Sequence, residues 1–212
     1  MRKRLLDLLF GCRCMLCGKT LKYGVLCPNC EDAMQLQFAD TQRRSFAGMN
    51  GVYPVFRYKG AMRTAILRMK FQHEISYADT FGIILADRAQ TLGLTADCVT
   101  FVPISALRMH FRGFNQSERM ARIVARELSL PCVPAMHRRL LSRRQSGLRH
   151  ERRHENAARS FYLRKNCDLT GKRVLLIDDI LTTGATLRTC AGLLKQAGAA
   201  EVTALVLANA GR

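Results

Sequence analysis

The chain has 212 residues, of which 48% are hydrophobic, so it can bury one ordinary core together with a small additional module. No apolar stretch approaches the length of a membrane span, and we expect a soluble, cytoplasmic protein. The formal net charge of +18 favours an anionic partner, most commonly nucleic acid, although a basic protein that neutralises phosphorylated substrates would show the same excess.

Four cysteines near the amino terminus have the spacing of a structural zinc site. Two Cys-x2-Cys pairs can bring four thiolates around one ion, and they are Cys14 with Cys17 and Cys27 with Cys30. The alternative is a pair of disulfides, which would need an oxidising compartment. The chain has a basic start, but the apolar run that follows is short and interrupted by Asp7, so we do not expect an export signal. Cys12 lies beside the set as an alternative ligand, an extra thiol or a lipoprotein-like cysteine.

The sequence predicts a zinc-ribbon module with its linker over residues 1–45 and a larger domain over 46–212. In the larger domain predicted strands alternate with predicted helices, which indicates an α/β fold with a parallel sheet and right-handed crossovers. Strands are expected over 52–58, 98–104, 132–136, 174–177 and 201–207, and helices over 61–71, 76–92, 115–128 and from about residue 186 to a stop at Gly198.

The most basic stretch covers residues 137–165 and contains two acidic residues. Its aromatic content is low, so we expect contact with single-stranded DNA to be mainly with phosphates and largely independent of base sequence. The residues predicted to form this phosphate track are Arg143, Arg144, Arg149, Arg152 and Arg153. The alternative is a lid that closes over a sugar phosphate through Gln145, Arg153 and Asn156.

Residues 174–186, VLLIDDILTTGAT, form the most informative segment. Its apolar start is typical of a central parallel strand that is covered on both faces. At the carboxyl end of such a strand, Asp178 and Asp179 can accept hydrogen bonds from two adjacent ribose hydroxyls. A hydroxyl-rich turn at the start of a helix follows, where an anion can bind, and it consists of Thr182, Thr183, Gly184, Ala185 and Thr186. The segment therefore fits a pentose phosphate.

This segment resembles the phosphoribosyl-diphosphate (PRPP) signature of type I phosphoribosyltransferases. In that signature an acidic pair lies between a hydrophobic strand and a Thr-Thr-Gly-x-Thr turn, and the similarity covers all thirteen residues. The alternative is that the acids only cap a strand and the turn only caps a helix.

Three further stretches resemble the ComF family, including its GntX-like members. They are Tyr58-Lys59-Gly60 with Lys70 and Phe71, then Arg112-Gly113-Phe114-Asn115-Gln116-Ser117, and then Gln145 with Leu148, Arg153, Asn156 and Phe161. The resemblance covers nearly the whole chain. Many relatives have additional cysteine pairs before the Tyr-Lys segment, so the zinc module of this chain should be smaller.

The resemblance implies a type I phosphoribosyltransferase fold preceded by a four-cysteine zinc ribbon, and an association with natural competence. Transferases of this kind displace diphosphate from a ribose carbon, so cations and Mg²⁺ would stabilise the departing group. By position, Ser105 and Arg108 belong to the diphosphate loop, and Arg112 is a candidate catalytic cation beside it. Asp178 and Asp179 would hold the ribose, and residues 182–186 the 5′-phosphate. A solvated surface pair is the alternative for Arg108 and Arg112.

The sequence is compatible with two functions. The first is a PRPP-binding competence protein that handles single-stranded DNA during uptake and transformation, with other competence proteins such as a DNA helicase or translocase as further partners. The second is a phosphoribosyltransferase of nucleotide or purine metabolism that acts on a small acceptor. An acceptor pocket lined by aromatic rings and amide donors would separate them, and the sequence identifies none. We therefore favour the first function and leave enzymatic turnover open.

Overall fold

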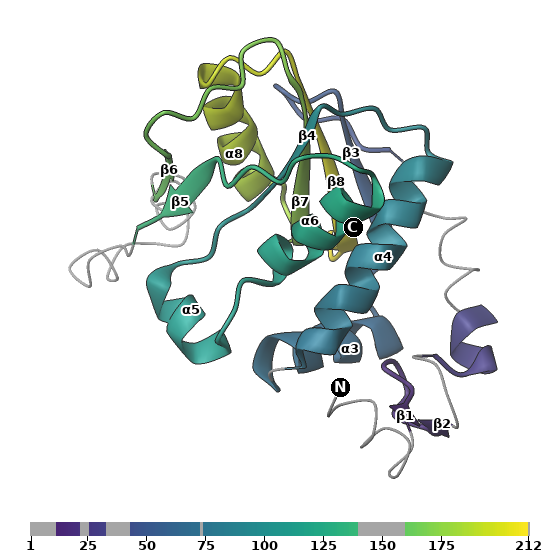
Figure 1. Cartoon of the computed structure of the whole chain (residues 1–212). Helices are drawn as coiled ribbons and strands as arrows, with labels where there is room; N and C mark the ends of the chain where they lie inside the picture. The colour runs from purple at the N-terminus through teal and green to yellow at the C-terminus, as the bar shows by residue number, and fades with distance from the viewer. Residues whose placement is uncertain (1–11, 22–25, 33–42, 73, 140–159, 212) are drawn as a thin grey trace.

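The structure is a computed structural model that describes residues 12–21, 26–32, 43–72, 74–139 and 160–211. Its centre is a four-stranded parallel sheet with the strand order β3-β8-β7-β4 (Figure 1). The strands are β3 (Gly51–Arg57), β4 (Cys98–Phe101), β7 (Arg173–Leu181) and β8 (Glu201–Asn209). Strand β7 is central and pairs with β8 on one side and with β4 on the other. The predicted parallel sheet is confirmed.

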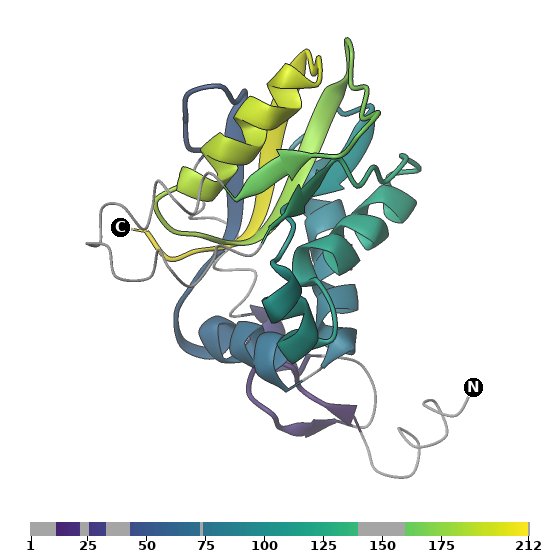
Figure 2. The same cartoon turned by 90° about the vertical axis from the view of Figure 1, so that its left-hand side faces the viewer.

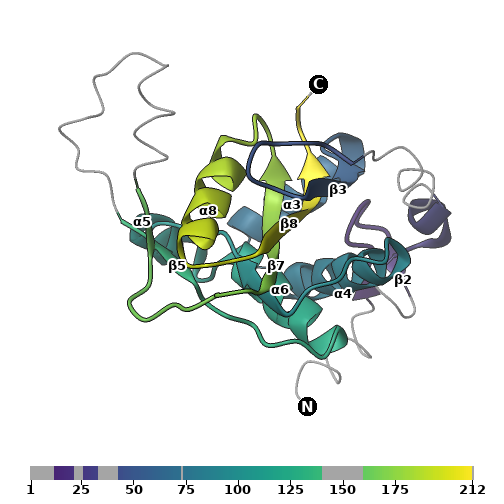
Figure 3. The same ribbon diagram turned by 90° about the horizontal axis from the view of Figure 1, so that it is seen from above.

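Helices cover both faces of this sheet (Figures 2 and 3). The helices are α3 (Gly60–Phe71), α4 (Ile75–Thr91), α5 (Ala106–Arg112), α6 (Gln116–Glu127) and α8 (Ala185–Gln196). Side chains of β7 alternate between the two faces. Leu175 and Ile177 belong to the core cluster that includes α3, α4 and α6, whereas Val174 and Leu176 belong to the cluster beneath α8. Burial on both faces explains the continuous apolar run of this strand.

Two small antiparallel sheets lie outside the main one. Strands β1 (Cys12–Arg13) and β2 (Thr20–Leu21) flank the first cysteine pair, and β5 (Met136–Arg138) pairs with β6 (Phe161–Leu163). No helix among the described residues has the length and apolarity needed to cross a membrane.

Two sequence predictions differ from the structure near prolines. The expected strand over 132–136 is reduced to one parallel bridge between Cys132 and Val99, and β5 begins only at Met136. Pro134 has no N–H to donate to a ladder, which explains the interruption. Strand β4 likewise ends at Phe101, two residues before Pro103.

Helix α5 was not predicted from the sequence. Its apolar residues Leu107, Met109 and Phe111 recur at every second position, which is the period of a strand, and none of its seven residues is buried. The helix begins at the N-cap Ser105, whose hydroxyl accepts a hydrogen bond from the Arg108 N–H at 3.4 Å. It ends at Gly113 in the left-handed conformation with φ 72°.

The contact between α4 and α6 gives a test of the core. An added Cβ at Gly82 would lie 2.6 Å from the Cβ of Ile123, which is fixed to the backbone of α6. We therefore expect Gly82→Ala to lower the free energy of unfolding by about 1–3 kcal/mol in urea denaturation. The control is Gly192→Ala in α8, where nothing lies within 4 Å, and this variant should be neutral or more stable by up to about 1 kcal/mol. Equal effects of the two substitutions would contradict this packing.

Candidate functional site

The predicted site residues meet at one edge of the sheet. Strands β4 and β7 are parallel neighbours, with Phe101 opposite Ile177, so the segments that follow them leave the sheet side by side. One segment leads to Ser105 and α5, and the other leads through Asp178 and Asp179 to α8. In parallel α/β sheets this carboxyl edge is where ligands bind. The acids do not terminate β7 as expected, because the strand continues to Leu181.

Asp178 is the buried member of the acidic pair, with 8% of its surface exposed. Its Oδ1 accepts a hydrogen bond from the Ser117 hydroxyl at 3.1 Å and another from the Asp179 N–H at 2.8 Å. Burial, and then the neighbouring charge of Asp179, raises the pKa of Asp178 to about 7. These two hydrogen bonds and the charge of Lys70 act in the opposite direction. Asp178 is therefore a carboxyl group that changes its charge near neutral pH.

Asp179 has a dedicated counter-ion. The Lys70 Nζ from the last turn of α3 lies 2.8 Å from Asp179 Oδ2, and both side chains are mostly buried. An ion pair that is largely removed from water holds its geometry better than a surface pair. The site thus joins α3 to β7 through a pair of opposite charges.

Two arginines lie near the acidic pair, Arg112 near Asp179 and Arg138 near Asp178, and Arg108 lies near both arginines. The Arg112 guanidinium donates to Gln116 Oε1 at 3.2 Å, and Asp179 lies near enough to favour its charged form, although burial lowers the pKa of Arg112. Burial and the nearby charge of Arg108 also lower the pKa of Arg138, whereas Asp178 raises it. Arg112 and Arg138 remain cationic, because a guanidinium does not lose its proton in proteins. The edge therefore combines two carboxyl groups with cations on several sides.

The turn after β7 has the geometry of a helix start. Gly184 is the N-cap of α8 with φ 75°, and an added Cβ there would lie 2.4 Å from the Phe46 ring, so only glycine fits. The Thr183 hydroxyl accepts a hydrogen bond from the Ala185 N–H at 3.4 Å. The first N–H groups of a helix lack partners within the helix and carry its positive dipole. The buried face of α8 consists of Leu187, Cys190, Ala191 and Leu194.

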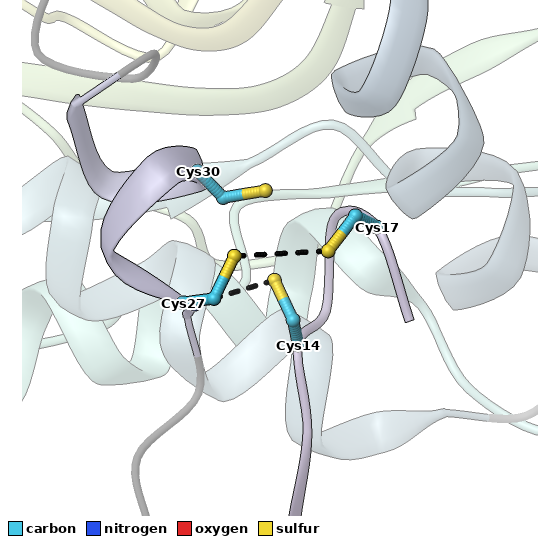
Figure 4. A group of neighbouring side chains, drawn as sticks. All are labelled: Cys14, Cys17, Cys27 and Cys30. Atoms are coloured by element: carbon cyan, nitrogen blue, oxygen red, sulfur yellow. Dashed lines mark hydrogen bonds between the residues drawn. The ribbon is translucent and has the colours of Figure 1, made fainter. Parts of the chain in front are cut away.

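The four amino-terminal cysteines form a second candidate site (Figure 4). The Sγ atoms of Cys14, Cys17, Cys27 and Cys30 all lie within 4.8 Å of one another, and those of Cys17 and Cys27 are 3.7 Å apart. Thiolates bound to one zinc ion at about 2.3 Å are separated by about 3.8 Å in a tetrahedron. Burial opposes ionisation of Cys14, but backbone N–H groups of Cys17, Cys27 and Leu16 lower its pKa to about 6. The cluster could therefore hold a metal ion.

The structure places the predicted residues that follow β4 and β7 at one edge of the sheet, and it shows further residues beside them. Arg143, Arg144, Arg149, Arg152 and Arg153 lie outside the described residues, as do Gln145 and Asn156. The residues that the sequence did not single out for the site are Lys70, Ser117 and Arg138. Lys70 and Ser117 lie in the stretches that carry the family resemblance, which was the available signal. Arg138 had no such signal, because it is one of many arginines in a basic stretch.

The sequence of this chain is similar to those of several known proteins. The family model for the phosphoribosyl transferase domain matches residues 115–212. Competence protein F of Haemophilus influenzae is 27% identical over 208 residues, which cover 93% of this chain and 90% of that protein. Competence protein ComFC of Bacillus subtilis is 28% identical over 206 residues, which cover 92% and 76%. DNA utilization protein YhgH of Escherichia coli is 28% identical over 148 residues, which cover 69% and 60%.

The parallel sheet and the acidic end of its central strand define a phosphoribosyltransferase domain of the type I fold. The four-cysteine cluster precedes this domain, and the similarity to competence proteins spans both parts of the chain. The chain is similar to competence proteins of the ComF type over nearly its whole length, in agreement with the resemblance that its sequence shows.

The raised pKa of Asp178 gives a test by pH. A carboxyl group whose pKa is higher in the folded state than its unfolded value near 4 contributes stability below pH 4 and loses it as the pH rises to about 7. Asp178→Asn removes this loss and can keep both hydrogen bonds at its amide oxygen. We expect the variant to be more stable than the parent at pH 8, by about 1 kcal/mol or more, with a smaller difference at pH 5.

The matched control is Asp97→Asn at the opposite end of β7. Asp97 is bonded to the Arg173 side chain and backbone, which lower the pKa of this carboxyl to about 2, so its removal should not stabilise the protein at pH 8. Urea denaturation at the two pH values measures both variants. Equal destabilisation by Asp178→Asn at pH 5 and pH 8 would show that Asp178 is an ordinary ionised carboxylate.

Proposed function

We propose that this protein binds PRPP at the carboxyl edge of its sheet and handles single-stranded DNA during uptake and transformation in natural competence. The observation that carries the proposal is the acidic pair at the end of the central strand, which has cations near it and is followed by the helix start at Gly184. A sugar that carries hydroxyls on one side and phosphates on two others matches this distribution of charge.

Each part of PRPP has a proposed partner. Asp178 and Asp179 accept hydrogen bonds from the ribose hydroxyls, and the turn over residues 182–186 receives the 5′-phosphate with its backbone N–H groups. Ser105 and Arg108 face the diphosphate, with Arg112 beside them. Mg²⁺ is the hard cation that suits diphosphate oxygens, and the carboxylates supply oxygen ligands near them. If turnover occurs, these cations stabilise the departing diphosphate.

The cysteine cluster is proposed to hold one structural zinc ion. Four cysteine sulfurs that lie within 4.8 Å of one another suit Zn²⁺, and a site closed by four protein ligands leaves no position for a substrate. Thiolate ligation also suits the reducing cytoplasm, which is the compartment that we propose.

The handling of DNA is proposed from two observations. The relatives are named for competence and for DNA utilization, and the chain has a formal charge of +18. The proposed phosphate track is Arg143, Arg144, Arg149, Arg152 and Arg153, with the lid function as the alternative for the same stretch. A DNA helicase or translocase of the competence machinery is a proposed further partner. The protein would then work where single-stranded DNA enters the cytoplasm.

PRPP binding is tested by thermal unfolding. A ligand that binds only the folded state stabilises it by mass action, by about 2.7 kcal/mol at a hundredfold excess over Kd. We therefore expect PRPP with Mg²⁺ to raise the melting temperature by several degrees. Asp178→Asn combined with Asp179→Asn should abolish the shift, and Asp97→Asn should keep it. A full response in the double variant would place the ribose elsewhere. Diphosphate release in the same samples measures turnover.

The zinc proposal is tested by metal analysis and chelation. The purified chain should carry one zinc ion, and Cys14→Ser combined with Cys17→Ser should lose it. Because metal binding substitutes for a core that so short a segment cannot build, a chelator should expose residues 12–32 to proteolysis. Cys98→Ser, outside the cluster, is the control that should retain zinc. Absence of metal together with four oxidised cysteines would contradict the site.

A further inference from the structure

We propose that Phe71 and Phe111, together with Arg112, form a stacking site for unpaired bases of single-stranded DNA. The inference rests on the proposed handling of DNA and adds to it the surface that contacts the bases. The basic stretch considered from the sequence accounts only for contacts with phosphates. The stacking site lies instead at the ends of α3 and α5.

Exposed apolar side chains gather on α5 and on the last residue of α3. Phe71 is 65% exposed, Phe111 69% and Leu107 51%. No residue of α5 is buried, so this helix contributes almost nothing to the core within the described part of the chain. Exposed phenylalanine rings cost free energy in water, and a cluster of them marks a binding surface.

The Arg112 guanidinium links the two helices. Its Cζ lies 5.4 Å from the centroid of the Phe71 ring, and Phe111 is its neighbour in the chain. The His110 ring packs edge-on against the Phe111 ring, and the two ring centroids are 5.7 Å apart. A single strand needs a flat surface for each base and a positive charge for each phosphate. The aromatic rings offer the first and the guanidinium offers the second.

The charge around these rings selects an anionic partner. Residues 57–72 and 102–117 contain no Asp or Glu. Lys70 is paired with Asp179, and the other cations at these helix ends are Arg68 on α3 and Arg108 and Arg112 on α5. A membrane surface would instead need one continuous apolar face along a longer helix. Exposed rings with cations beside them fit the bases and the phosphates of a single strand.

The stacking site borders the acidic pair. Phe71 directly follows Lys70, whose Nζ lies 2.8 Å from Asp179. A base on the Phe71 ring would therefore lie beside the proposed ribose site, with Arg112 between the two.

The chain has no tryptophan, so a single introduced indole reports on its own surroundings. Phe71→Trp and Phe111→Trp keep an aromatic ring at each position, and a stacked base quenches indole fluorescence. The control is Ile83→Trp, at a 52% exposed position on α4. We expect single-stranded oligonucleotides to quench the first two variants and not the third. An abasic oligonucleotide of equal length, which keeps the phosphates, should quench none of them.

Affinity is measured independently by the fluorescence anisotropy of a labelled oligonucleotide. Phe71→Leu combined with Phe111→Leu removes two rings but no charge, so we expect affinity to fall about tenfold or more while its salt dependence stays the same. The PRPP-induced rise in melting temperature should be unchanged.

Binding of DNA without quenching at positions 71 and 111 would overturn the stacking site and leave the proposed function standing. Absence of DNA binding in the parent protein would overturn both. Quenching by anionic vesicles, with none by DNA, would overturn the stacking site in favour of a membrane contact.

Discussion

The molecule depends on the burial of two carboxyl groups at the end of a strand that is covered on both faces. Strand β7 must be apolar to lie between two core clusters, yet it continues into Asp178 and Asp179 before it ends. A carboxylate that leaves water without a partner is strongly destabilised. The fold compensates the burial of these two carboxyl groups in different ways. Asp179 receives the ammonium of Lys70, whereas Asp178 receives neutral hydrogen bonds and a raised pKa.

This difference gives the two acids different chemical properties. The position of Asp179 is fixed by its ion pair with Lys70 of α3, while the charge of Asp178 depends on its surroundings. A ligand that donates hydroxyl hydrogen bonds to Asp178 favours the ionised form and so works against its burial. Burial of Asp178 therefore lowers the folding stability at neutral pH, and a hydrogen-bond donor beside this carboxyl group would change its charge. Such perturbed groups are common at functional sites.

The sequence predicts the parts of this arrangement that follow from periodicity. The run 174–177, the apolar face of α8 and the order of strands and helices all come from residues that pack in the core. The ion pair of Lys70 with Asp179 could not be predicted, because it joins residues 109 positions apart and only the topology brings them together. Helix α5 could not be predicted either, since it has no buried face to impose a helical period. Periodic sequence patterns indicate which residues are buried. The ion pair depends instead on the topology of the fold, and α5 has no buried face.

Helix α3 links the two candidate sites. Met15 and Leu16, from the loop between the first two cysteines, belong to the same buried cluster as Met62 and Met69 of this helix. An added Cβ at Gly18 would lie 3.6 Å from the Arg68 guanidinium, so the cysteine loop also contacts the last turn of α3. Lys70 lies two residues further along that turn. Because interiors are closely packed, whatever holds the cysteine loop in place also fixes the ammonium that neutralises Asp179. The cysteine segment is thus part of the support of the acidic site, although none of its described residues contributes a group to that site.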